Sequence, residues 1–215
     1  TPSTYAAPKV RPVKWNCSLD YGFDNAFAAG FYALLPKDER PQAYKVKEVV
    51  VRGLKAREQA RLVLQTLEDM GTELDTPAYL DTACWKEDDD GLSIAKKFMQ
   101  EGLPVQQVLK DRATGWVAVE DLLAYETEDG VVSSEPRLKI FDTCPITVQQ
   151  LTDAQWDPKK PGDILHPEGF RDDAIDETRY WALTHFGAPK RQVEGNRFDH
   201  HKKVWAAMTK PKRRW

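Results

Sequence analysis

The chain has 215 residues, 41% of them hydrophobic, which is enough for one substantial domain with its own core. Its formal net charge of −3 at pH 7 gives no support to nucleic-acid binding through a generally basic surface. No run of about 18 apolar residues occurs, and residues 1–12 lack the apolar centre of a signal peptide, so we expect a soluble intracellular protein that does not enter a membrane.

The first third of the chain predicts a β-meander followed by a helix. Trp15, Cys17 and Leu19 alternate with polar residues, which is the period of a half-buried strand. Strands are predicted over residues 13–20, 26–35 and 44–53. Apolar residues at helical spacing then predict a helix over 55–70.

The remainder of the chain alternates helices and strands. In chain order, the pattern predicts a strand over 77–81, a helix over 92–102, a strand over 103–109, a helix over 115–126, a strand over 137–141, a helix over 147–153, an irregular connection over 157–170, and helices over 171–186 and about 196–208. Three strands followed by this alternation predict an α/β domain with a mixed sheet and helices on its faces. The three cysteines are odd in number and widely separated, which argues against a disulfide framework and a zinc site.

Acidic residues stand where such a sheet binds ligands. Asp20 ends the first predicted strand, and Asp81 ends the fourth. Ligands of α/β sheets gather beyond the carboxyl ends of the strands, so both carboxylates are expected near a binding site.

A third group of acids opens the predicted helix over 171–186. An Asp at a helix N-terminus commonly caps free backbone N–H groups and complements the helix dipole. Residues three or four positions apart share a helix face, so Asp173 and Asp176, or Asp172 and Asp176, can also present their carboxylates side by side. Such a pair repels itself unless a cation lies between, and the local pattern leaves both interpretations open.

Carboxylates that converge without basic partners need cations. Mg²⁺ and Mn²⁺ prefer oxygen ligands and keep positions open for water and phosphate oxygens. Two such ions, roughly 3.5–4 Å apart, can activate a water and stabilise the departing oxygen in phosphodiester hydrolysis. The acids at the strand ends and on the late helix therefore point to a site for two divalent cations.

Several stretches, taken in order, resemble the nuclease domain of tailed-phage terminase large subunits. They are "CSLDYGFDNAFAAGFYAL", "YLDTACW", "GLSIAKKFMQEGLPVQQVLKDRATGWVAVEDLL", "LKIFDTCP" and "DDAIDETRYWAL". The resemblance runs from about Trp15 to Phe186. Its most specific parts are Asp20 with Gly22, and a helix opening in which an acid or His precedes a "DAxRY" motif by three residues, as Asp173 precedes Asp176 here.

The resemblance implies an RNase H-like fold and metal-dependent endonuclease activity on double-stranded viral DNA during genome packaging. It makes Asp20 the bridging metal ligand, Asp81 the second ligand and Asp176 the third. Asp173 takes an auxiliary position where some members have His, and Asp172 is an extra candidate ligand. The ions expected from the resemblance are Mg²⁺ or Mn²⁺.

This chain departs from the family pattern at Glu177, where the family usually has Ala, and we expect Glu177 to pair with a Lys or Arg. An acid in 87–90 is an alternative second ligand to Asp81. Arg179 and Tyr180 either orient the acids or pack as an ion pair and a partly buried ring.

The resemblance also has consequences for domain organisation. The packaging motor of the family needs an ATPase domain, yet no GxxxxGK[ST] motif occurs here. We therefore expect residues 1–12 to be a linker and 13–215 to be a single nuclease domain with a basic C-terminal tail. The implied partners are double-stranded DNA, the ATPase domain of a longer protein, the portal and the small terminase subunit, in the host cytoplasm.

Basic residues outside the acid clusters are candidates for DNA contact. They are Lys110 and Arg112 after a predicted strand, and Lys202 and Lys203 near the C-terminus. Lys and Arg at such positions bind phosphates without sequence preference, although a solvated loop or a solubilising tail gives the same pattern.

Two other functions fit the same acids. Another RNase H-like nuclease, such as a junction resolvase or a transposase core, would carry a similar triad and differ in substrate. A non-catalytic docking module for portal or packaging partners would use the acids for capping alone. Metal titration separates this module from the nucleases, because a docking module should show no stabilisation by Mn²⁺ that depends on the carboxylates.

Overall fold

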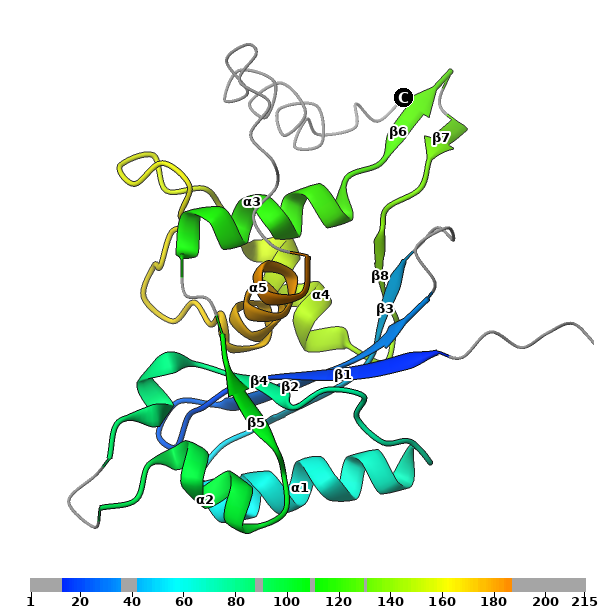
Figure 1. Cartoon of the computed structure of the whole chain (residues 1–215). Coiled ribbons are helices and arrows are strands. Elements are labelled where there is room, and N and C mark those ends of the chain that lie inside the picture. Colours follow the sequence, from blue (N-terminus) through cyan, green and yellow to red (C-terminus); the bar gives the residue numbers. More distant parts are fainter. Residues whose placement is uncertain (1–12, 36–41, 88–90, 109–110, 130, 187–215) are drawn as a thin grey trace, which may run out of the picture.

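A computed structural model of the chain describes residues 13–35, 42–87, 91–108, 111–129 and 131–186. A six-stranded mixed sheet forms the centre, and helices cover both of its faces (Figure 1). This arrangement confirms the predicted α/β class. Within the described part of the chain, none of the helices has the length and apolar character needed to cross a membrane.

The strands of the sheet lie in the order β5-β4-β1-β2-β3-β8. Their bounds are β1 Lys14–Asp20, β2 Phe27–Leu34, β3 Ala43–Val51, β4 Ala78–Leu80, β5 Val105–Gln107 and β8 Leu138–Ile140. The first three form the predicted antiparallel meander. Strand β4 pairs in parallel with β1, β5 with β4, and β8 with β3, so the sheet is mixed.

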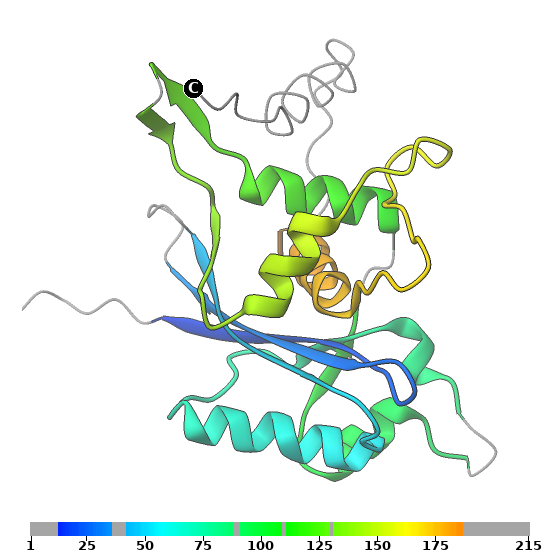
Figure 2. The same ribbon diagram turned by 180° about the vertical axis from the view of Figure 1, so that it is seen from behind.

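The helices divide between the two faces. Their bounds are α1 Ala56–Asp69, α2 Ile94–Gln100, α3 Arg112–Leu123, α4 Pro145–Asp153 and α5 Asp173–Phe186, with a short 3₁₀ helix η1 Thr82–Trp85 after β4. Helices α1 and α2 cover one face, and α4 and α5 cover the other (Figures 1 and 2). Helix α3 packs on the outer side of α5, so α5 is enclosed between the sheet and α3, and every residue from Asp173 to Leu183 is buried.

Alternation along β1 directs its side chains to two different layers. Cys17 and Leu19 belong to the apolar core beneath α1 and α2, as the period-two pattern predicts. Ser18 points to the opposite face, where its hydroxyl contacts the backbone of α5. Asp20 has the same parity as Ser18, and therefore lies on the face that α5 covers.

Two features differ from the prediction. The helix expected to reach residue 126 ends at Leu123, and an antiparallel hairpin of β6 Glu126–Glu128 and β7 Val131–Ser134 follows it. The hairpin side chains are almost all exposed, so these strands have no buried face and no alternation by which they could be recognised. The helix expected over about 196–208 and the linker over 1–12 lie outside the described residues.

Candidate active site

Asp20 and Asp81 lie at the same edge of the sheet. Strands β1 and β4 run parallel with Leu19 opposite Leu80, so the residues that follow this pair are Asp20, the last of β1, and Asp81, directly after β4. The chain turns immediately after Asp20, and a Cβ on Gly22 would lie 2.7 Å from the carbonyl oxygen of Asn25. A side chain at position 22 would therefore force this turn to open.

The carboxylate of Asp81 is held on both oxygens. Its Oδ1 accepts a hydrogen bond from the backbone N–H of Ala83 at 2.6 Å, which caps the 3₁₀ helix η1. Its Oδ2 accepts a hydrogen bond from the hydroxyl of Tyr180 at 2.9 Å. Asp81 is only 8% exposed, so a residue of α5 fixes the orientation of a carboxylate that follows β4.

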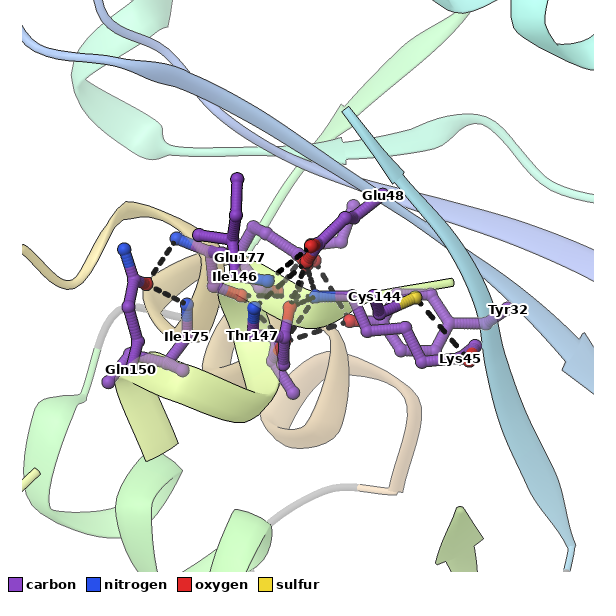
Figure 3. A network of polar contacts seen from close by, with 12 residues as sticks. Tyr32, Lys45, Glu48, Cys144, Ile146, Thr147, Gln150, Ile175 and Glu177 are labelled. Atoms are coloured by element: carbon purple, nitrogen blue, oxygen red, sulfur yellow. Dashed lines mark hydrogen bonds and ion pairs between the residues drawn. The ribbon is translucent and has the colours of Figure 1, made fainter. Parts of the chain in front are cut away.

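A side chain of α4 caps the first backbone N–H groups of α5. The N–H groups of Ala174 and Ile175 donate to Oε1 of Gln150, at 2.9 and 3.3 Å. Gln150 belongs to α4, and Figure 3 shows its side chain reaching the start of α5. Part of the capping that was expected from the acids is therefore done by Gln150, which the sequence pattern did not indicate.

Asp173 and Asp176 are each 8% exposed and have arginine partners. Asp176 accepts a hydrogen bond from Nε of Arg179 at 3.1 Å on one oxygen and from Nη1 of Arg112 at 3.0 Å on the other. Nε of Arg171 lies 3.3 Å from Oδ2 of Asp173. The expectation of carboxylates without basic partners is thus wrong, because the charges on α5 are partly compensated within the chain.

The electrostatics of Asp20 show that the three groups of acids converge. Burial raises the pKa of Asp20 well above its ordinary value, and Asp176, Asp173, Asp172 and Asp81 raise it further, in that order. Each of these charges disfavours the ionised form of Asp20 because like charges at short range repel. Carboxylates from the end of β4 and from the start of α5 are therefore near enough to Asp20 in β1 to act on its charge.

Asp172 lies at the margin of this cluster. Burial, followed by the charge of Asp176, raises its pKa. Its Oδ2 is 3.4 Å from Nδ1 of His166 and 3.6 Å from Nη2 of Arg112. His166 comes from the connection predicted as irregular, and its place beside an acid could not be read from its spacing.

Arg112 lies among the carboxylates at the first turn of α3. Besides Asp176 and Asp172, its guanidinium contacts Asp163, with 2.9 Å between Nε and Oδ1. Asp163, in the connection before α5, was not identified from the sequence. Contact between Arg112 and DNA stays a prediction, and the other basic candidates, Lys110, Lys202 and Lys203, lie outside the described residues.

Arg179 and Tyr180 combine both roles expected for them. The guanidinium of Arg179 lies 4.6 Å from the ring centre of Tyr180 and 5.7 Å from that of Trp116, so it is packed between two rings. The same two side chains hydrogen-bond Asp176 and Asp81. Packing therefore fixes the donors that orient the acids.

The chemistry of this donor set suits a hard divalent cation. Carboxylate oxygens are the ligands that Mg²⁺ and Mn²⁺ prefer, and burial together with the neighbouring carboxylates raises the pKa of Asp20. Among the described residues, no three His, Cys, Asp or Glu side chains are grouped so that they could hold a metal ion as they stand. Of the alternative ligands in 87–90, Glu87 pairs with Lys96, and residues 88–90 lie outside the described part.

Solved structures of large terminases share this fold. The nuclease domain of the P22 large terminase matches over 82% of this chain and 83% of that domain, with a TM-score of 0.58 and 16% identity. The nuclease domain of the bacteriophage SPP1 large terminase, with bound Mn, matches over 80% and 86%, with a TM-score of 0.52 and 16% identity.

A longer protein also matches. The large terminase of a thermophilic bacteriophage, in complex with ADP, matches over 82% of this chain with a TM-score of 0.59 and 21% identity, and the chain spans 40% of its length. No protein-family model matches the sequence, and no curated protein sequence matches it. The likeness in structure, at low identity, shows that the chain has the RNase H-like α/β fold of the large terminase nuclease domains.

Proposed function

We propose that this chain is a metal-dependent endonuclease that cuts double-stranded viral DNA during genome packaging. The observation that carries the proposal is geometric: Asp20 and Asp81 stand at the same edge of the sheet, and Tyr180 of α5, one turn after Asp176, hydrogen-bonds Asp81. The fold of terminase nuclease domains supports the substrate, and the Mn in the SPP1 nuclease domain supports a divalent cation. The docking module has no comparable support, because it needs no buried cluster of like charges.

Asp20, Asp81 and Asp176 would hold two Mg²⁺ or Mn²⁺ ions, with Asp173 as an auxiliary ligand and Asp172 as an extra one. Bound there, the ions would supply an activated water and stabilise the departing oxygen of the phosphodiester. Tyr180 orients Asp81, and Arg179 orients Asp176, through the hydrogen bonds described above. Arg112 balances the charge of Asp176 and Asp172 and is a candidate to contact a DNA phosphate.

The proposal also concerns partners. In the longer terminase that matches, this chain corresponds to less than half of the protein. We propose that the nuclease works beside an ATPase domain, with the portal and the small terminase subunit as further partners, in the host cytoplasm. A linker over 1–12 and a single nuclease domain over 13–215 belong to the same proposal.

The decisive experiment is cleavage of plasmid DNA by this chain in Mn²⁺, Mg²⁺ or EDTA. Wild type is expected to nick the plasmid only with metal, and Asp20→Asn and Asp176→Asn should each abolish nicking. Asp69→Asn, an exposed acid on α1 at the opposite face of the sheet, is the matched control and should cleave normally.

The same assay separates the alternatives. Preference for a four-way junction over linear duplex would replace the terminase assignment by a resolvase. Full activity in both Asn variants would disprove the carboxylate mechanism. Absence of cleavage together with no Mn²⁺-dependent rise in melting temperature would favour a docking module.

A further inference from the structure

A buried ion pair joins strand β3 to helix α5. Lys45 and Glu177 are both 0% exposed at the side chain, and Nζ of Lys45 contacts Oε1 of Glu177 (Figure 3). The same Nζ is within hydrogen-bond distance of Oγ1 of Thr147 in α4, of Oγ1 of Thr178 at 3.0 Å and of the carbonyl oxygen of Ala174 at 3.2 Å. The ammonium group therefore has partners from two helices.

Glu177 is fixed on its other side as well. Its Oε2 accepts a hydrogen bond from the hydroxyl of Tyr32 in β2 at 2.9 Å. A Cβ on Gly30, also in β2, would lie 2.6 Å from Cδ of Glu177. The carboxylate occupies space that any other residue at position 30 would fill, so the absence of a side chain at Gly30 makes room for Glu177.

The backbone of Glu177 is tied to the strand that carries Asp20. The hydroxyl of Ser18 donates to the carbonyl oxygen of Glu177 at 2.8 Å. Ser18 lies two residues before Asp20 on the same face of β1, and Glu177 directly follows Asp176. The hydrogen bond between Ser18 and Glu177 therefore links Asp20 to Asp176 through a short stretch of backbone on each side.

The network continues to the start of α5 through α4. Glu48 of β3 accepts hydrogen bonds from the backbone N–H of Ile146 at 2.6 Å and of Thr147 at 3.0 Å, which fixes the first turn of α4 to the sheet. Gln150, one turn later, accepts from the first N–H groups of α5. The end of α5 that bears Asp173 is thus anchored to β3 by a second route.

These contacts set the register of α5 on the sheet. An apolar contact surface tolerates small rotations and shifts, whereas a buried charge displaced from its partner loses strong interactions that water cannot replace. At 3.6 residues per turn, a rotation of α5 by one residue position would swing Asp176 away from β1. Gly30, Ser18, Tyr32 and Lys45 all contact the single residue Glu177, so only one register satisfies them together.

We propose that the Lys45–Glu177 pair is a positioning element of the nuclease. It fixes the rotation of α5 about its axis and its register on the sheet, so that Asp173 and Asp176 face Asp20 and Asp81. Neither residue touches the reacting atoms. This inference rests on the proposed function, because it assigns the pair to the geometry of the metal-binding acids.

The test uses the double variant Lys45→Met with Glu177→Gln, which removes both charges at nearly constant volume. Each single variant leaves one buried charge unpaired and should lower the melting temperature, whereas the double variant should largely restore it. The apparent Mn²⁺ affinity, measured by calorimetry, should nevertheless fall by about tenfold, and cleavage at saturating Mn²⁺ should fall by about tenfold or more. A double variant that folds and matches wild type in both measurements would overturn the inference.

A second variant keeps the test decisive if the double variant does not fold. Ser18→Ala removes only the hydroxyl that donates to Glu177 and should weaken Mn²⁺ binding severalfold. Thr66→Val is its control, because Thr66 donates the equivalent hydroxyl-to-carbonyl bond inside α1, on the other face of the sheet. If Ser18→Ala and Thr66→Val bind Mn²⁺ with equal affinity, the Lys45–Glu177 pair has a purely structural role and the inference is overturned.

The two proposals fail in different ways. If wild type neither cleaves nor binds Mn²⁺, the proposed function fails and the inference fails with it. If wild type cleaves and the variants match it, the inference alone fails.

Discussion

The hydroxyl of Tyr180 donates a hydrogen bond to Oδ2 of Asp81 across 2.9 Å, although the two residues are 99 positions apart in the chain. Burial raises the pKa of Tyr180 far above its ordinary value, and the charges of Asp20 and Asp176 raise it further. The phenol therefore stays protonated at any physiological pH and remains a donor. An aromatic residue of the last described helix thus orients an acid at the end of the fourth strand.

Replacing Tyr180 with Phe removes this donor and keeps the ring against Arg179. We expect a loss of about 1–3 kcal/mol in the free energy of unfolding, because a buried carboxylate loses a hydrogen-bond donor. Stabilisation by Mn²⁺ should also weaken, since Asp81 is less well oriented. Urea unfolding with and without Mn²⁺ measures both effects. Tyr125→Phe, at an exposed position, is the control, and identical curves for the two variants would contradict the prediction.

The raised pKa of Asp20 predicts how stability depends on pH without metal. Between the ordinary pKa of Asp, about 4, and the higher value in the fold, the folded protein retains a proton that the unfolded chain has released. Stability therefore falls as the pH rises through this window. In EDTA at pH 7, Asp20→Asn should melt a few degrees higher than wild type, and the difference should shrink as the pH approaches 4. Thermal melts across this range test the prediction, and a variant less stable than wild type throughout would refute it.

Arg112 is expected to act as a counter-ion of the acid cluster. Arg112→Gln removes one guanidinium from Asp163, Asp172 and Asp176, so in EDTA it should cost about 2 kcal/mol of stability. Added Mn²⁺ should then raise the melting temperature of the variant more than that of wild type, because the cation relieves the larger repulsion.

The control for Arg112 is Arg137→Gln. Arg137 pairs with Asp121 on α3, at a distance from the acids, and its loss should leave the response to Mn²⁺ unchanged. Equal Mn²⁺ responses of the two variants would show that Arg112 does not balance the cluster.

The positions of the acids at the sheet edge follow from simple patterns. Period-two alternation in residues 13–20 identifies Cys17 and Leu19 as core, which fixes Asp20 on the other face. The parallel pairing of β1 and β4 then brings Asp20 and Asp81 together, as expected for strand ends in an α/β sheet. Their roles as metal ligands stay predictions.

Other parts of the site depend on tertiary packing that local patterns do not contain. Lys45 alternates with apolar residues in β3, as a solvent-facing lysine would, yet α4 and α5 cover it completely. Of the residues in this network, only Glu177 was noted in the sequence, because an acid in place of the usual Ala predicted a basic partner. The ion pair with Lys45 confirms that prediction. Asp163 and Gln150 carry no motif, because their partners come from distant elements.

The enclosure of α5 between the sheet and α3 has a consequence for protein synthesis. Ser18 and Glu177 are 159 residues apart. Because ribosomes add about 5–20 residues per second, α5 is synthesised roughly ten to thirty seconds after β1. During that delay α1 can already cover the apolar face of β1, whereas the uncovered face bears Ser18 and Asp20, which water solvates well. Until α5 is made, this face of β1 therefore presents Ser18 and Asp20 to water, and its apolar side chains Cys17 and Leu19 lie on the face that α1 covers.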